Sequence, residues 1–106
     1  MNKLEKINVL TVIKGRKSSN PIVVEKLSVM TGVSDRVCKK YVQDLRQEGL
    51  PIAGDEDGYF WAENPADLDH VINIIKAHIH SRQETIRSLE RTRLAMLRDG
   101  SMSSLL

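Results

Sequence analysis

The sequence predicts a mainly α-helical chain with one small β-hairpin, followed by one long carboxyl-terminal helix. Three observations lead to this fold class. Apolar residues recur at helical spacing in three short segments before residue 50. Two short apolar arms flank a glycine-bounded loop at 54–58, and neither Gly nor Pro occurs between Pro65 and Gly100. Of the 106 residues, 41% are hydrophobic but only 4% aromatic, so the core must consist mainly of Val, Ile and Leu.

The first helix is predicted over residues 4–14, with a left-handed C-terminal cap at Gly15. A polar, basic loop follows at 16–20, and then Pro21-Ile22-Val23, which is long enough only for a single β-bridge. Apolar residues of the helix lie on one stripe: Leu4, Ile7, Val9, Leu10 and Ile13.

Two further helices are predicted on either side of a tight turn. The first is short and ends at Gly32, with Val24, Leu27 and Met30 facing inward. The second begins after Ser34, which is a good N-cap, and ends at Gly49. Its buried stripe, bordered by Tyr41, contains Val37, Cys38, Val42 and Leu45.

A hairpin and a long helix complete the chain. The hairpin arms are predicted at 50–53 and 59–62. Asn64-Pro65-Ala66-Asp67 has the cap, proline and acidic residue typical of a helix start, and a helix of about 33 residues is expected to follow. This order of elements is that of a winged helix-turn-helix, in which the helix after the tight turn can enter a DNA major groove. The predicted organisation is a winged helix-turn-helix domain at 1–63, a long helix at 64–99 and a flexible tail at 100–106.

The segment from Leu27 to Tyr59 resembles the amino-terminal winged-helix domain of the biotin operon repressor and similar small bacterial and prophage regulators. The resemblance implies the winged-helix fold, double-stranded DNA as the partner, and a role in transcription regulation or replication. It is carried by Leu27, Gly32-Val33-Ser34, Val37, Cys38, Val42-Gln43, Leu45-Arg46, Gly49 and Gly58-Tyr59. No counterpart of the repressor's biotin-ligating domain follows, and a mobile-element origin is one implication of the likeness.

The outward face of the predicted recognition helix contains the candidate DNA-binding residues. Arg36 can form a forked contact with guanine and Gln43 with adenine, whereas Lys39 and Lys40 can neutralise phosphates. Arg46 lies one turn further on and is expected to contact phosphate or to pair with Asp44 or Glu48. The remaining candidates are Ser34, which also caps the helix, and the basic loop residues Arg16 and Lys17. The alternative role of the two loop residues is only to keep the loop soluble.

The loop of the predicted wing is acidic, unlike wings that contact DNA. Asp55, Glu56 and Asp57 stand in a row, and phosphates would repel them. Either the wing points away from DNA or it binds a basic protein partner. The alternative function is therefore a protein-interaction adaptor that uses the winged-helix fold without binding DNA.

The long helix has an apolar stripe at alternating steps of four and three residues, which is typical of a coiled coil. Because the small domain cannot cover so long a stripe, we expect a homodimer; the alternative is a helix folded back on its own domain. Seven of nine seam positions are apolar, and Arg82 and Arg93 interrupt the seam. The predicted dimerisation residues are Ile72, Ile75, Ile79, Ile86, Leu89 and Met96.

Signals for catalysis and metal binding are weak, so an enzyme is not expected. His78 and His80 point to different helix faces, and His70 is two turns away, so neither a metal nor another cofactor is predicted. Cys38 falls in a buried stripe and is interpreted as a small core residue. We expect a cytoplasmic protein for three reasons. The sequence has a single cysteine, it has no apolar run long enough for a membrane span, and we find no secretion signal in it.

Overall fold

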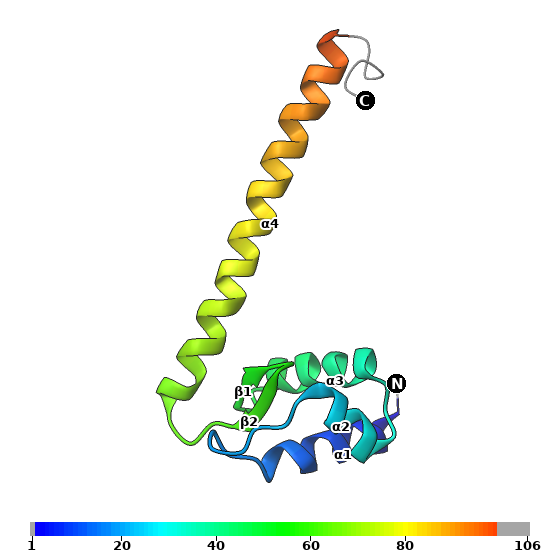
Figure 1. The fold of residues 1–106 in the computed structure, drawn as a ribbon, viewed down its shortest axis with the longest axis vertical. Helices are drawn as coiled ribbons and strands as arrows, with labels where there is room; N and C mark the ends of the chain where they lie inside the picture. The colour runs from blue at the N-terminus through cyan, green and yellow to red at the C-terminus, as the bar shows by residue number, and fades with distance from the viewer. Residues whose placement is uncertain (1, 100–106) are drawn as a thin grey trace. The chain divides into compact units, whose positions relative to one another are not determined.

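The computed structural model, shown in Figure 1, describes residues 2–99. The predicted tail at 100–106 lies outside the described residues. Contacts divide the chain within the last helix, into one unit up to Ile72 and a second from Asn73 onward. The elements are α1 (Lys3–Lys14), α2 (Val24–Thr31), α3 (Asp35–Gln47), β1 (Ile52–Asp55), β2 (Gly58–Trp61) and α4 (Pro65–Asp99).

Helix α1 buries only the second half of the predicted stripe. Asn2 caps it, accepting hydrogen bonds from the backbone N–H groups of Leu4 and Glu5. Val9 and Ile13 are fully buried, whereas Leu4 and Ile7 are 65% and 47% exposed. The predicted three-residue steps drift around a helix of 3.6 residues per turn, so only one end of that stripe reaches the core. The cap at Gly15 is also not left-handed, because its φ is −85°.

The turn between α2 and α3 forms as predicted. Gly32 closes α2 in the left-handed conformation, with φ 72°, and Ser34 caps α3 by accepting a hydrogen bond from the Val37 N–H. Met30 is 54% exposed, so it is not the inward residue that its spacing predicted. Tyr41 is buried, while Val37 is only partly buried.

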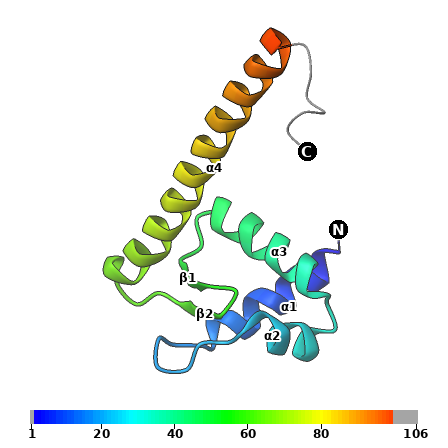
Figure 2. The same cartoon turned by 45° about the horizontal axis from the view of Figure 1, so that its top comes forward.

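The hairpin is tighter than the sequence suggests. Strands β1 and β2 are antiparallel, with Ile52 opposite Trp61 and Asp55 opposite Gly58, so that the turn contains only Glu56 and Asp57. Ile22 forms the predicted β-bridge, exchanging two backbone hydrogen bonds with Tyr59. Figure 2 shows α1, α2 and α3 gathered around this hairpin.

The core of the first unit lies where the three short helices meet the hairpin. Aliphatic side chains dominate it, as predicted, and two tyrosines complete it. Cys38 is buried among them, and its burial raises the pKa of the thiol. The largest fully buried side chains are Tyr41, Ile13, Ile22, Leu27, Ile52, Val9, Val42 and Cys38.

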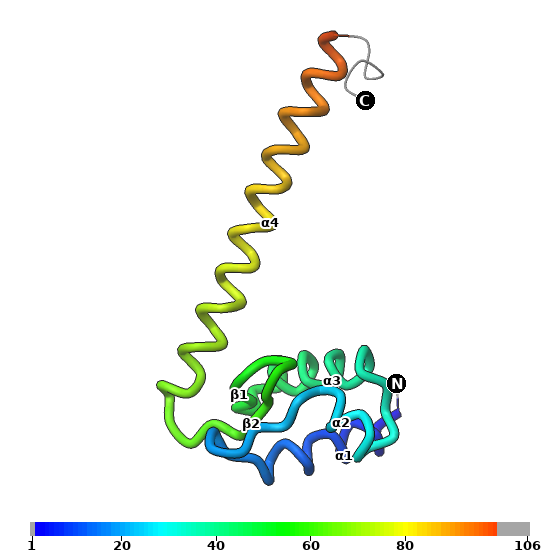
Figure 3. The backbone as a smooth tube through the Cα atoms, viewed as in Figure 1, coloured from blue at the N-terminus to red at the C-terminus, as the bar shows by residue number. Residues whose placement is uncertain are grey.

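Helix α4 is continuous over 35 residues (Figure 3). The side chain of Asn64 accepts a hydrogen bond from the Asp67 N–H, as the sequence of the helix start predicts. Val71 is buried near the start of the helix. None of the helices in the described part of the chain combines the length and apolar character that a membrane crossing requires.

Candidate nucleic-acid interface

Helix α3 presents one polar face to solvent. Burial of Cys38, Tyr41, Val42 and Leu45 fixes the rotation of the helix about its axis. The remaining face is exposed, with two cationic side chains in the middle and an amide one turn later. Its exposed residues include Arg36, Lys39, Lys40 and Gln43.

Both lysines of this face form ion pairs within the chain. Lys39 Nζ lies 2.6 Å from Glu56 of the hairpin turn, and Lys40 Nζ lies 2.9 Å from Asp44 one turn along α3. The hydrogen bond to Glu56 raises the pKa of Lys39. Each lysine side chain is 48% exposed, so these are surface pairs, which stabilise the fold only slightly and exchange readily for other anions.

The acidic turn of the hairpin lies beside α3. In addition to the Glu56 carboxylate against Lys39, the backbone carbonyl of Glu56 accepts a hydrogen bond from the Val24 N–H at 2.8 Å. The Asp55 carboxylate accepts a hydrogen bond from the Asp57 N–H and closes the turn. The acidic turn is therefore held between the start of α2 and the polar face of α3. The pair between Lys39 and Glu56 could not be predicted from the sequence, because it joins residues 17 positions apart.

Arg46 is part of the packing between α3 and the hairpin. Its Nε and Nη2 donate hydrogen bonds to the carbonyls of Ile52 and Gly54 at 3.0 and 2.7 Å. The guanidinium also lies over the Tyr59 ring, 5.8 Å from its centroid. The local partners predicted for it are engaged elsewhere: Asp44 pairs with Lys40 and Glu48 with Lys6. The predicted local pairing of Arg46 is corrected, because its guanidinium bonds to the hairpin instead, whereas its predicted contact with phosphate stays a prediction.

The surroundings of Arg46 and Tyr59 are poor in water. Burial lowers the pKa of the Arg46 guanidinium, which stays charged. Burial also raises the pKa of Tyr59 to about 12, although the nearby guanidinium opposes the shift. A cation that is held in this way supports the hairpin.

Arg46→Ala should therefore destabilise the first unit by about 2–3 kcal/mol, because two partly buried, charge-assisted hydrogen bonds to backbone carbonyls are lost. Urea unfolding followed by fluorescence of Trp61, the only tryptophan, measures this change. Arg36→Ala is the control, since an exposed arginine should change stability by no more than about 0.5 kcal/mol. Equal stabilities for the two variants would show that Arg46 does not hold the hairpin.

The basic loop after α1 contacts α2 and β2. Arg16 Nη1 donates to the Asn20 side chain at 3.3 Å, and Nη2 lies 3.9 Å from Met30 Sδ. The Arg16 carbonyl accepts a hydrogen bond from the Trp61 N–H, and Lys14 lies over the Trp61 ring. Lys17 is exposed. These contacts hold Arg16 in the surface of the first unit without joining it to the polar face of α3.

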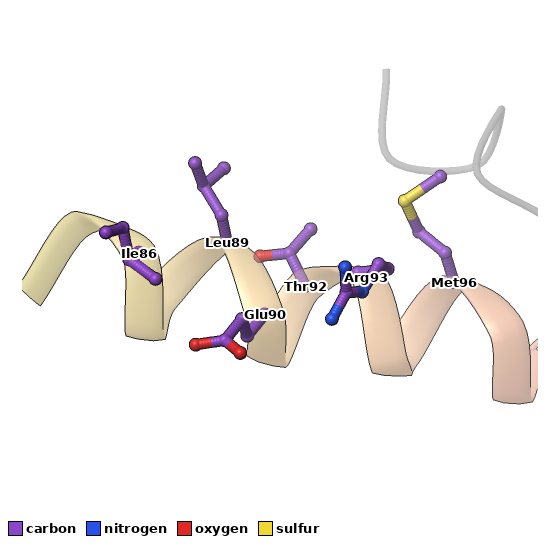
Figure 4. Close-up of a pocket in the computed structure, with 6 residues that line it drawn as sticks. All are labelled: Ile86, Leu89, Glu90, Thr92, Arg93 and Met96. Carbon is purple, nitrogen blue, oxygen red and sulfur yellow. The ribbon is translucent and has the colours of Figure 1, made fainter. Parts of the chain in front are cut away.

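The predicted seam of α4 is exposed to solvent. The exposed fraction of the six predicted dimerisation residues ranges from 41% at Met96 to 63% at Leu89. Leu94 and Leu97, which the seam pattern did not include, are also exposed. Figure 4 shows Leu89 and Met96 projecting from the same side of the helix. An exposed apolar strip of this length is typical of an interaction surface.

Other kinds of site have little support. Within residues 2–99, no three His, Cys, Asp or Glu side chains come together in a way that could hold a metal ion. His80 pairs with Glu84 on α4, at 3.1 Å.

Comparison of the chain with protein-family models, curated proteins and solved structures gave no match.

Proposed function

We propose that this protein binds double-stranded DNA as a winged helix-turn-helix protein, with α3 in the major groove. The observation that carries the proposal is the exposed polar face of α3, directly after the tight turn at Gly32. A hairpin follows α3 and packs against it through Arg46, the arrangement that a winged helix requires. The proposed role is that of a small transcriptional regulator or a replication accessory protein.

The residues of α3 divide into two kinds of contact. Arg36 and Gln43 can read base edges, because a guanidinium matches guanine and an amide matches adenine. Lys39 and Lys40 contact phosphates, exchanging Glu56 and Asp44 for the DNA backbone. Ser34 remains the cap of α3, and its position at the helix start allows the backbone there to approach a phosphate.

Self-association through α4 is the second part of the proposal. Its exposed seam requires a partner, and a second copy of the chain supplies the same stripe. Two copies bring two α3 helices to the DNA, which increases affinity through effective concentration.

Binding to short duplexes at several salt concentrations tests this function. Affinity should fall steeply with salt, because phosphate contacts release counterions. Arg36→Ala and Gln43→Ala should each reduce the preference for a selected site over random duplex by about 1–3 kcal/mol. Lys40→Ala should weaken binding to all duplexes alike and lower the salt slope by about one. Arg91→Ala, on the outer face of α4, is the matched control, and affinity that does not respond to salt would contradict the proposal.

An adaptor that binds proteins and not DNA is the second candidate function. It is favoured by the acidic turn, which already neutralises Lys39, and by Val29, which is 83% exposed on α2. In that function the carboxylates of the turn bind a basic partner. The duplex titration separates the two functions, since an adaptor gives no salt-dependent binding to DNA.

A further inference from the structure

The orientation of the α4 pair follows from the charges in and beside its seam. The central part of the seam consists of Ile75, Ile79, Arg82, Ile86, Leu89 and Arg93. Its four apolar members are 44–63% exposed in the single chain, so this face is open to a second copy. The two arginines determine which orientation of the copies is favourable, because two like charges in contact within a seam destabilise the pair.

A parallel pair in register places each seam residue beside the same residue of the other copy. Arg82 of one copy would then lie beside Arg82 of the other, and Arg93 beside Arg93, so the seam would contain two contacts between like charges. Like charges held in contact are unfavourable, most of all where apolar neighbours exclude water. The flanking positions offer no ion pair in return, because Lys76 and Glu90 are 14 residues apart, or about 21 Å along the axis.

An antiparallel pair centred on Glu84 removes both clashes. Arg82 then lies opposite Ile86 of the second copy, and Arg93 opposite Ile75. Ile79 meets Leu89, so every layer contains at least one apolar residue. The aliphatic stem of each arginine covers its apolar neighbour, while the guanidinium reaches the edge of the pair.

The flanks of the same antiparallel pair are complementary in charge. Lys76 directly follows a seam position, as does Glu90, and this alignment places Lys76 of each copy beside Glu90 of the other. The two-fold axis produces the ion pair twice. Shifting the alignment by one heptad either brings Asp69 beside Glu90 or places Arg82 opposite Arg93. One alignment therefore satisfies both the seam and its flanks.

We propose that α4 pairs with α4 of a second copy in an antiparallel coiled coil centred on Glu84, with Lys76 of each copy beside Glu90 of the other. This proposal rests on the dimer of the proposed function and specifies its geometry. The two Ile72 positions are then 24 residues apart, or about 36 Å along the axis, whereas a parallel pair holds them side by side.

Disulfide trapping distinguishes the orientations. In the antiparallel pair, Ile79→Cys alone and Leu89→Cys alone should form no cross-link, because equal positions lie about 15 Å apart. An equimolar mixture of the two variants should form a disulfide-linked heterodimer. A parallel pair gives the reverse, with each variant cross-linking alone. The unsubstituted protein is the control, since its only cysteine, Cys38, is buried.

A charge exchange tests the register. Lys76→Glu and Glu90→Lys should each weaken dimerisation about tenfold in sedimentation, because two ion pairs become two repulsions, and the double variant should recover it. Glu84→Lys with Arg91→Glu makes the same exchange on the outer face and should have no comparable effect. A dimer that cross-links in parallel, or shows no recovery, overturns the antiparallel proposal and leaves DNA binding standing. A folded chain that stays monomeric at high concentration overturns this proposal together with the dimer of the proposed function, while duplex binding by α3 is measured separately.

Discussion

Gly54→Ala should destabilise the first unit by at least about 3 kcal/mol, the largest effect on stability that we expect from a single methyl group. Gly54 has φ +79°, a conformation that side chains rarely adopt. Its added Cβ would also lie 2.9 Å from the carbonyl carbon of Gly58, and closer still to the carbonyl oxygen. Both obstacles are backbone, so neither can rotate away. Urea unfolding followed by Trp61 fluorescence measures the loss, because Trp61 lies on β2.

Gly49→Ala is the matched control for this prediction. Gly49 also has a positive φ, of +93°, but nothing lies within 4 Å of an added Cβ. Gly49→Ala should therefore lower the free energy of unfolding only by the backbone strain, about 1–2 kcal/mol. If the two variants are equally stable, the close approach of the two hairpin strands at Gly54 and Gly58 is wrong.

The hairpin itself was predictable from the sequence, but the ends of its strands were not. Two apolar arms around an acidic loop predicted a hairpin, and one is present. The predicted loop, however, included Gly54 and Gly58, which instead lie in the strands and leave a two-residue turn. Strand ends depend on which backbone groups pair, and composition does not determine the pairing register.

Helix ends were predictable where a side chain or a glycine determines them locally. Ser34 and Asn64 cap helices as expected, and Gly32 takes the left-handed conformation. The orientation of α1 was predictable only in part. Val9 and Leu10 are adjacent and both apolar, so the pattern did not decide which side faces the core, and packing against α2 and α3 selected Val9 and Ile13.

For the candidate interface, the sequence predicted which α3 residues are exposed but not what they contact. Burial on a helix follows from its period, so Arg36, Lys39, Lys40 and Gln43 could be placed outward. The contacts of Arg46 and Lys39 depend on where the hairpin folds back, and contacts of this kind leave no local signal. The apolar stripe of α4 could be located from the sequence because one helix carries the whole pattern, whereas its role as a dimer seam stays a prediction.

Because both α3 lysines are already paired within the chain, each should add less to duplex affinity than an unpaired lysine. Releasing Lys39 from Glu56 costs the protein an ion pair, so part of the gain from each phosphate contact is offset. Glu56→Gln removes this competitor and a negative charge beside the proposed DNA-binding face of α3. It should therefore tighten binding to duplexes of any sequence, with folding unchanged because Glu56 is exposed.

The combined change of Arg36, Lys39 and Lys40 to alanine should reduce duplex affinity at least about 100-fold at low salt. Two phosphate contacts and one base contact are lost together, and the salt slope should fall by about two. The fold should remain, since all three side chains are exposed, and an unchanged unfolding curve of Trp61 fluorescence checks this. Glu56→Gln is the companion variant, because it changes the charge of the same surface in the opposite direction. If the triple variant binds duplex as tightly as the unsubstituted protein while folding normally, α3 does not contact DNA. The acidic turn would then be the functional surface, and the adaptor function would replace DNA binding.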